Sequence, residues 1–301
     1  MTEKMQDDVL ENYVKAGKIA SQVREEARSF VKPGMTLLSI AERIESRIKE
    51  LGGEIAFPVN LSINDLAAHY TPYRNDTLVL GEDVIKIDIG VHVDGYVADT
   101  AMTLSFNEEE KEKCDNLIKA SKEALENAIE KVKPGALLSD ISSAIEETIK
   151  SHGFNPVSNL TGHGIDRFNL HDQPQVPNVK FKSDYRLPED KVIAIEPFAT
   201  TGVGRIKETE PTLIYMMLRE GNARNTDGRV ILKHASEFGG LPFAERWLPI
   251  ESRVKIKIAM RELVSRGLIY EYPPLKEISS GLVSQAEHTI IVGEEPIVTT
   301  K

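Results

Sequence analysis

An internal repeat is the feature of this 301-residue chain that most restricts its fold. VKPGMTLLSIAERIESRIKELGG at 31–53 aligns without gaps with VKPGALLSDISSAIEETIKSHGF at 132–154, an offset of 101 residues. Lys-Pro-Gly, three isoleucines at helical spacing and a glycine after them recur at the same phase. Amphipathic helices resemble one another by chance, but a shared Lys-Pro-Gly at one phase is harder to obtain that way. We therefore expect two related α-α-β halves packed into one α+β domain, with a site at their junction.

The remaining periodicity places other elements around this repeat. It predicts four helices and several strands, including two buried strands late in the chain. The helices are expected at 6–31, 36–51, 108–132 and 137–152, and the two buried strands at 191–200 and 287–293.

Residues 205–275 break the repeat order. Helical runs at 209–219, 228–238 and 251–266 are followed by the strand-like GLIYEYPPL. We expect an inserted helical subdomain of winged-helix type over 205–275, with 1–204 and 276–301 forming the main domain. A likeness to winged-helix DNA binders does not carry function, although the basic run 251–266 leaves some nucleic-acid contact as an alternative.

A predicted hairpin carries two acids that are unusual in strands. VIKIDIGVHVDGYVADTAMTL at 84–104 contains Asp88 and Asp99, and Asp94-Gly95 is a strong signal for a type I′ turn. Such a turn pairs residues whose numbers sum to 189, which puts both carboxylates on one face as diagonal neighbours. Two anions aimed at one spot repel unless a cation lies between them. A solvated, half-exposed face is the alternative.

Further candidate ligands lie beyond the second repeat helix. His163 and His171 occur in the Gly/Asn-rich run TGHGIDRFNLHDQP, where flanking glycines allow close backbone approach. Glu196 ends an apolar strand in AIEPF, and Glu287 opens another in SQAEHTIIV. Either carboxylate alone could be an edge residue or an ion-pair partner, but four acids on four apolar strands plus a histidine form a coherent metal-ligand set.

Composition excludes several classes of protein. A net charge of −10 and a pI near 5.3 argue against binding duplex nucleic acid, which needs a basic face. The single cysteine, Cys114, excludes a disulfide framework and is expected at a packed helix position. No signal peptide or membrane-length apolar run is visible, so we expect a cytoplasmic protein without membrane contact.

The candidate ligands also carry a resemblance. In their order along the chain they match the five-ligand pattern of the pita-bread metallopeptidases, which likewise have two pseudo-symmetric α-α-β halves. The motifs AAHYTP at 67–72, DIGVHVDGYVADTA, TGHGIDRFNLH and RWL…YPPL…AEHTI, with the insertion, resemble the type II methionine aminopeptidase branch, in an archaeal-like form. The resemblance covers essentially the whole chain.

The resemblance implies a methionyl aminopeptidase with two divalent ions, either Mn, Fe(II), Co or Zn. A hydroxide activated by the two ions would attack the first peptide bond and release the initiator methionine from nascent chains that have a small second residue.

The resemblance also assigns roles to individual residues. The metal ligands by resemblance are Asp88, Asp99, His163, Glu196 and Glu287. Glu196 would also transfer the proton, His69 would lie near the scissile bond, and His171 would steady the oxyanion. Phe57, Pro58, Asn60, His69, Leu170, His171, Pro242 and Tyr272 would form the substrate pocket. The resemblance further suggests a monomer and ribosome contact.

Two related activities remain as alternatives. The Xaa-Pro peptidases share the five ligands, but they usually have a large N-terminal domain and lack such an insertion. Non-catalytic binding proteins of the same fold lose ligands and carry basic tails, whereas this chain keeps all five ligands. One local departure is His171-Asp172-Gln173-Pro174, where the family often has a His-Ala-Gly-Lys-like run. This difference concerns fine specificity and not the metal ligands.

Overall fold

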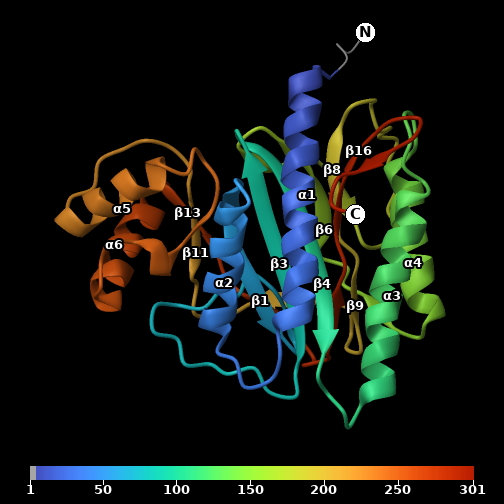
Figure 1. The fold of residues 1–301 in the computed structure, drawn as a ribbon, viewed down its shortest axis with the longest axis horizontal. Coiled ribbons are helices and arrows are strands. Elements are labelled where there is room, and N and C mark those ends of the chain that lie inside the picture. Colours follow the sequence, from blue (N-terminus) through green and yellow to red (C-terminus); the bar gives the residue numbers. More distant parts are fainter. Residues whose placement is uncertain (1–4) are drawn as a thin grey trace.

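The first half of the chain folds as two helices over a three-stranded sheet. The computed structural model describes residues 5–301, and Figure 1 shows its ribbon. The elements of this half are α1 (Asp7–Phe30), α2 (Leu37–Glu50), β1 (Glu54–Ile63), β2 (Leu66–Ala68), β3 (Val84–Val93) and β4 (Tyr96–Ser105). The sheet has the order β1-β3-β4, and α1 packs on β3 and β4.

The second half repeats this plan with a larger sheet. Its elements are α3 (Lys111–Ile129), α4 (Leu138–Ser151), β5 (Asn155–Pro156), β6 (Thr161–Asp166), β7 (Asn169–Pro177), β8 (Val192–Ile195), β9 (Phe198–Thr200), β15 (Val283–Gln285), β16 (His288–Ile291) and β17 (Ile297–Val298). They form a five-stranded sheet of order β17-β16-β8-β6-β7 and a small sheet of order β15-β9-β5. The four helices predicted outside the insertion and both predicted buried strands are confirmed, the first of these strands being divided by Glu196-Pro197 into β8 and β9.

The sequence repeat corresponds to a structural repeat. Helices α2 and α4 begin and end at positions that are 101 residues apart. The glycines of both Lys-Pro-Gly turns have positive φ, 89° at Gly34 and 80° at Gly135. Gly52 and Gly153, which follow the two helices, also have positive φ, 79° and 82°. A side chain is strained in that region of φ, so the shared glycines preserve the same turns before and after each helix.

The segment 205–275 contains two helices and a small sheet. Its elements are β10 (Ile206–Glu208), β11 (Ile214–Met217), α5 (Thr226–Ser236), β12 (Phe243–Ala244), the short 3-10 helix η1 (Glu245–Trp247), α6 (Arg253–Ser265) and β13 (Ile269–Tyr272), followed by β14 (Leu275–Glu277). Figure 1 shows α5 and α6 at the opposite side of the molecule from α3 and α4.

The helix predicted at 209–219 is wrong. This stretch contains β11, which pairs with β12 on one side and β13 on the other. Its sequence Ile-Tyr-Met-Met is too short and too uniformly apolar for periodicity to separate a helix from a buried strand. Hydrogen bonding to a strand on each side therefore stabilises this stretch as a strand, although its local sequence pattern suggested a helix.

A separate hydrophobic cluster lies within this segment. All its buried members fall between Tyr215 and Ile269. The two ends of the segment lie side by side, because β10 pairs with β14, and β14 in turn pairs with β2 of the first half. Domain boundaries at 204/205 and 275/276 stay a prediction. Among the described residues, no helix has both the length and the apolar character needed to cross a bilayer.

A buried ion pair joins the inserted segment to the first half. Arg246 in η1 contacts Glu45 on α2, and its guanidinium also donates to Thr71 Oγ1 (2.6 Å) and Pro72 O (3.0 Å). Glu45 accepts from the Trp247 indole and from the Val59 amide, each at 3.2 Å. Burial raises the pKa of Glu45 and lowers that of Arg246, because loss of water disfavours the charged form of each group. The attraction between the two charges acts against this desolvation cost.

We expect Arg246→Met to destabilise the fold by about 3–5 kcal/mol, because it leaves the Glu45 carboxylate buried without its cation. The double variant Arg246→Met/Glu45→Leu should recover much of that loss, since it removes both charges together. Urea unfolding of the metal-free protein would measure the difference. Equal stability of the single and double variants would contradict this account of the junction.

Candidate metal and substrate site

The hairpin geometry predicted from the sequence is present. Asp94 and Gly95 have φ of 52° and 85°, as a type I′ turn requires. In the β3–β4 ladder Asp88 pairs with Ala101 and Gly90 with Asp99. Asp99 is only 4% exposed, and both carboxylates line an internal cavity. The solvated-face alternative is therefore wrong for this hairpin.

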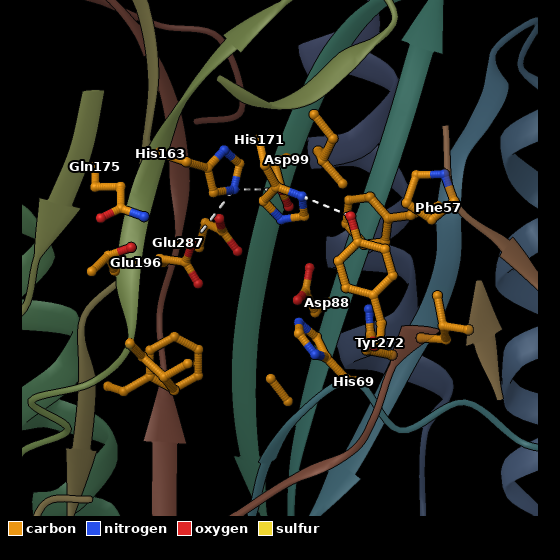
Figure 2. Close-up of a pocket in the computed structure, with 18 of the residues that line it drawn as sticks. Phe57, His69, Asp88, Asp99, His163, His171, Gln175, Glu196, Tyr272 and Glu287 are labelled. Carbon is orange, nitrogen blue, oxygen red and sulfur yellow. Dashed lines mark hydrogen bonds and ion pairs between the residues drawn. The ribbon is translucent and has the colours of Figure 1, made fainter. Parts of the chain in front are cut away.

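The other predicted ligands reach the same cavity from the second half. His163 lies on β6, Glu196 follows β8, and Glu287 immediately precedes β16. Figure 2 shows these side chains converging with the two aspartates. Ligand atoms of Asp99, His163 and Glu287 all lie within 4.8 Å of one another, and His163 Nε2 is 3.6 Å from Glu196 Oε1.

The hydrogen bonding of His163 presents a lone pair to the carboxylates. Nδ1 lies 3.1 Å from the carbonyl oxygen of Gly164 and can donate only if it carries the ring proton. Burial lowers the pKa of His163 to about 4, so the ring is neutral near pH 7. Nε2 is then an acceptor 3.7 Å from Asp99 Oδ2, an arrangement of two acceptors that suits a cation between them.

The electrostatics of the carboxylates point the same way. Burial, and then mutual repulsion, raise the pKa values of Asp99, Glu196 and Glu287 well above their usual range. Asp88 Oδ1 and Asp99 Oδ1 are buried and have no hydrogen-bond partner among residues 5–301. Buried polar atoms without partners are costly, and four clustered acids with one neutral imidazole fit oxygen-preferring divalent ions. The residues therefore fit the metals that the resemblance implied.

Glycines beside His163 allow the strands to approach closely. A Cβ on Gly162 would lie 2.2 Å from the carbonyl oxygen of Ala194, and one on Gly164 would lie 2.1 Å from that of Gln173. Since β6 lies between β8 and β7, each glycine serves one neighbouring strand. The Gly-His-Gly sequence thus fixes the position of His163 by backbone packing.

Threonine hydroxyls join the two halves at the ligands. Strands β4 and β16 belong to different sheets and share one isolated bridge, Ala101 to Glu287. Thr289 Oγ1 accepts from the Asp99 amide (2.7 Å) and donates to the Asp99 carbonyl (2.9 Å). Thr100 Oγ1 donates to the Glu287 carbonyl at 2.9 Å. These bonds form what we call the threonine seam, and they replace ladder bonds where the sheets diverge.

A cavity of about 380 Å³ surrounds the acids, within the usual size range of ligand sites. All predicted ligands and most predicted pocket residues line it, including Phe57, Asn60, Leu170, Pro242 and Tyr272.

Pro58 is the exception among the predicted pocket residues, because it lies in the irregular stretch of β1 between Phe57 and Asn60 and does not line the wall. The sequence predictions missed eight residues that line the cavity. Four of them lie in or beside a motif singled out above: Ala68 in AAHYTP, Phe198 in AIEPF, Thr161 at the start of the histidine-containing run, and Gln175 directly after that run. The eight are Ala68, Asn159, Leu160, Thr161, Gln175, Phe198, Ile214 and Tyr270.

His69 and His171 both contact Tyr272. The ring centroids lie 5.4 Å and 5.6 Å from that of Tyr272, and His69 has a left-handed backbone with φ of 64°. The Tyr272 hydroxyl is 3.2 Å from His171 Nδ1. Burial raises the pKa of Tyr272, which therefore keeps its proton. The hydroxyl can donate that proton to Nδ1, which is a stronger acceptor than the Met216 sulfur 3.5 Å away. His171 Nε2 then carries the ring proton and can donate into the cavity that this partly exposed residue lines.

We expect Thr289→Val to weaken divalent-metal affinity by roughly tenfold or more, because it deprives the Asp99 backbone of both bonds and lets a ligand shift. Stability should also fall by about 1–3 kcal/mol for each buried group left without a partner. Calorimetric metal titration and thermal unfolding would measure the two effects. Thr299→Val is the matched control, because Thr299 Oγ1 bonds the Thr289 carbonyl and not Asp99. Equal metal affinity in both variants would exclude a role for the threonine seam in ligand placement.

Comparison with known proteins identifies the family to which the chain belongs. Residues 11–233 match the family described as Metallopeptidase family M24. A methionine aminopeptidase of Thermococcus onnurineus is 51% identical over 96% of this chain and 98% of its own length. A methionine aminopeptidase of Thermotoga maritima has the same fold, with a TM-score of 0.74 and 24% identity over the full length of both chains. A thermophilic Arx1 is also similar in fold, with a TM-score of 0.84 and 19% identity over 98% of this chain and 91% of its own. This chain belongs to metallopeptidase family M24, with the pita-bread fold.

Proposed function

We propose that this chain removes the N-terminal methionine from peptides and nascent proteins by metal-dependent hydrolysis of the first peptide bond. The observation that carries the proposal is the convergence of four acids and His163 on a cavity with an apolar wall; Asp99 and Glu287 are buried, and the other two acids are half-buried. The strong similarity to methionine aminopeptidases over nearly the whole chain supports it.

The five converging residues would hold two divalent ions. Bound there, such ions lower the pKa of water and polarise a carbonyl group. A site rich in carboxylate oxygens and lacking thiolates favours Mn, Fe(II) or Co, with Zn as a further candidate. The number and identity of the ions stay predictions.

The protein's own groups manage protons and developing charge. The pKa of Glu196 is raised by burial and by Asp88, which suits a carboxylate that takes a proton from water and passes it to the departing amine. His171, held by Tyr272, offers Nε2–H to the carbonyl oxygen as that oxygen gains negative charge. Burial lowers the pKa of His69 to about 4, so this ring also acts as a neutral group near the scissile bond.

The shape of the cavity accounts for selectivity at the first residue. Its apolar wall includes Phe57, Leu170, Ile214 and Pro242. An unbranched thioether adapts to such a wall and gains sulfur–aromatic contact with Phe57. A small second residue, nascent chains as physiological substrates, ribosome contact, a monomeric state and a cytoplasmic location remain predictions from the sequence.

The test is methionine release from Met-Ala-Ser by metal-stripped protein, before and after Mn(II) or Co(II) is added. We expect release only after metal addition, and no cleavage of an Ala-Pro-Ser peptide assayed beside it. Cleavage of the proline peptide would instead indicate the Xaa-Pro branch. If neither peptide is cleaved although metal is bound, the result would favour a non-catalytic binding protein.

Asp99→Asn should abolish methionine release and weaken metal binding, because it removes the charge of a carboxylate that faces both halves of the site. Asp94→Asn is the matched control in the same hairpin, since Asn-Gly also forms a type I′ turn. Metal content by elemental analysis and initial rates would be compared for both variants. Full activity in Asp99→Asn would mean that the ligand assignment is wrong.

Tyr272→Phe should lower kcat by roughly tenfold and change KM little, because the ring remains in the wall while His171 loses its hydrogen bond. Tyr215→Phe serves as the control, because Tyr215 lies in the same small sheet and its hydroxyl donates to Thr212 O (3.0 Å), away from His171. An unchanged kcat in Tyr272→Phe would show that Tyr272 does not orient His171.

A further inference from the structure

A second cavity adjoins the metal cavity and shares part of its wall. It measures about 430 Å³, and six of its ten lining residues also line the first cavity. The residues that only the second cavity contacts are Asp172, Gln173, Met216 and Leu218. None of the four acids lines the second cavity, so the two adjoining spaces define a path that leads away from the acids.

One face of the β11–β13 ladder forms an apolar strip along this path. Ile214 pairs with Tyr272 and Met216 with Tyr270, so these four side chains share a face. Ile214 and Tyr272 line the inner cavity, Met216 lines the outer one, and Leu218 follows two residues later on the same face. Four residues of nearly extended chain span about 13 Å.

The outer end of this strip is unusually exposed. Leu218 is 51% exposed and Tyr270 is 48% exposed, although both lie beside the path. Exposed large apolar side chains are ordinary when scattered singly. Here they continue an apolar wall that begins inside the metal cavity, so they are not scattered singly.

A strand from a different sheet also lines the outer cavity, and it is the end strand of that sheet. β7 is an end strand of the five-stranded sheet formed by the described residues, and it supplies His171, Asp172, Gln173 and Gln175 to the outer cavity. An edge strand offers backbone donors and acceptors to an extended peptide, whatever the sequence of that peptide. The apolar strip can then distinguish side chains.

We propose that this trench between β7 and the apolar strip binds the third and fourth residues of the substrate and favours apolar side chains there. The inference rests on the proposed function, because an aminopeptidase holds the first residue in a closed pocket and the rest of the peptide must leave through an opening. Continuity with the metal cavity identifies the occupant as the substrate's own downstream segment.

The experiment compares KM and kcat for Met-Ala-Ser-Ser, Met-Ala-Leu-Ser and Met-Ala-Ser-Leu with Mn(II)-loaded protein. At least one leucine peptide should have a KM roughly three- to tenfold below that of the serine peptide, with similar kcat, because one apolar side chain is partly removed from water. Leu218→Ser should bring this KM ratio close to one.

Ile258→Ser is the matched control. Ile258 is 61% exposed on α6 of the same inserted segment, and it lines neither cavity. This variant should keep the KM ratio of the unmodified protein. Methionine release with equal KM for all three peptides, or an undiminished ratio in Leu218→Ser, would overturn the inference while leaving the proposed function intact. Absence of methionine release from every peptide would instead reject the proposed function, and the inference with it.

Discussion

The site depends on holding carboxylates from two separate sheets close together against their repulsion. Asp99 comes from β4 of the first half and Glu287 from the position just before β16, and both are almost fully buried. The threonine seam fixes their backbones, and Arg24 of α1 extends it, donating to Thr100 Oγ1 (2.6 Å) and Thr300 O (2.9 Å). Without such fixed backbone bonds, the sheets could separate and relieve the repulsion at the expense of the site. The cost of the cluster is thus met by the architecture around it.

Local chemistry explains which parts of the fold were predictable. The turn at Asp94-Gly95 sets the register of the strands on either side of it. Counting residues from the turn therefore predicted that Asp88 and Asp99 lie on the same face of the hairpin. The repeat likewise set the bounds of α2 and α4, because the same glycine turns begin and end both helices. The stretch around β11 failed, since its partners lie about 30 to 60 residues away in the chain and no local signal names them.

The same distinction applies to the site. The acidic metal-ligand candidates were recognisable because an acid is unfavourable in an apolar strand, and its position within an apolar run can be read directly from the sequence. The contact between Tyr272 and His171 joins positions 101 residues apart, and the bond from Thr289 to Asp99 spans 190. A threonine or tyrosine in a strand is locally unremarkable, so nothing in the sequence marks these roles. Pro58 was misplaced because the irregular pairing of β1 shifts which of its side chains face the cavity.

The inserted segment connects stability to substrate recognition. Its strand β13 supplies Tyr272 to the catalytic cavity and Tyr270 to the outer trench, while Arg246 anchors the same segment to Glu45 of α2. Movement of this segment would therefore displace the apolar wall, the partner of His171 and the trench together. Its large buried cluster and the buried ion pair limit such movement, since neither can be exposed without substantial cost. The inserted segment must be rigid in this way, because Tyr272 has to stay within hydrogen-bond distance of His171 to hold that ring in position.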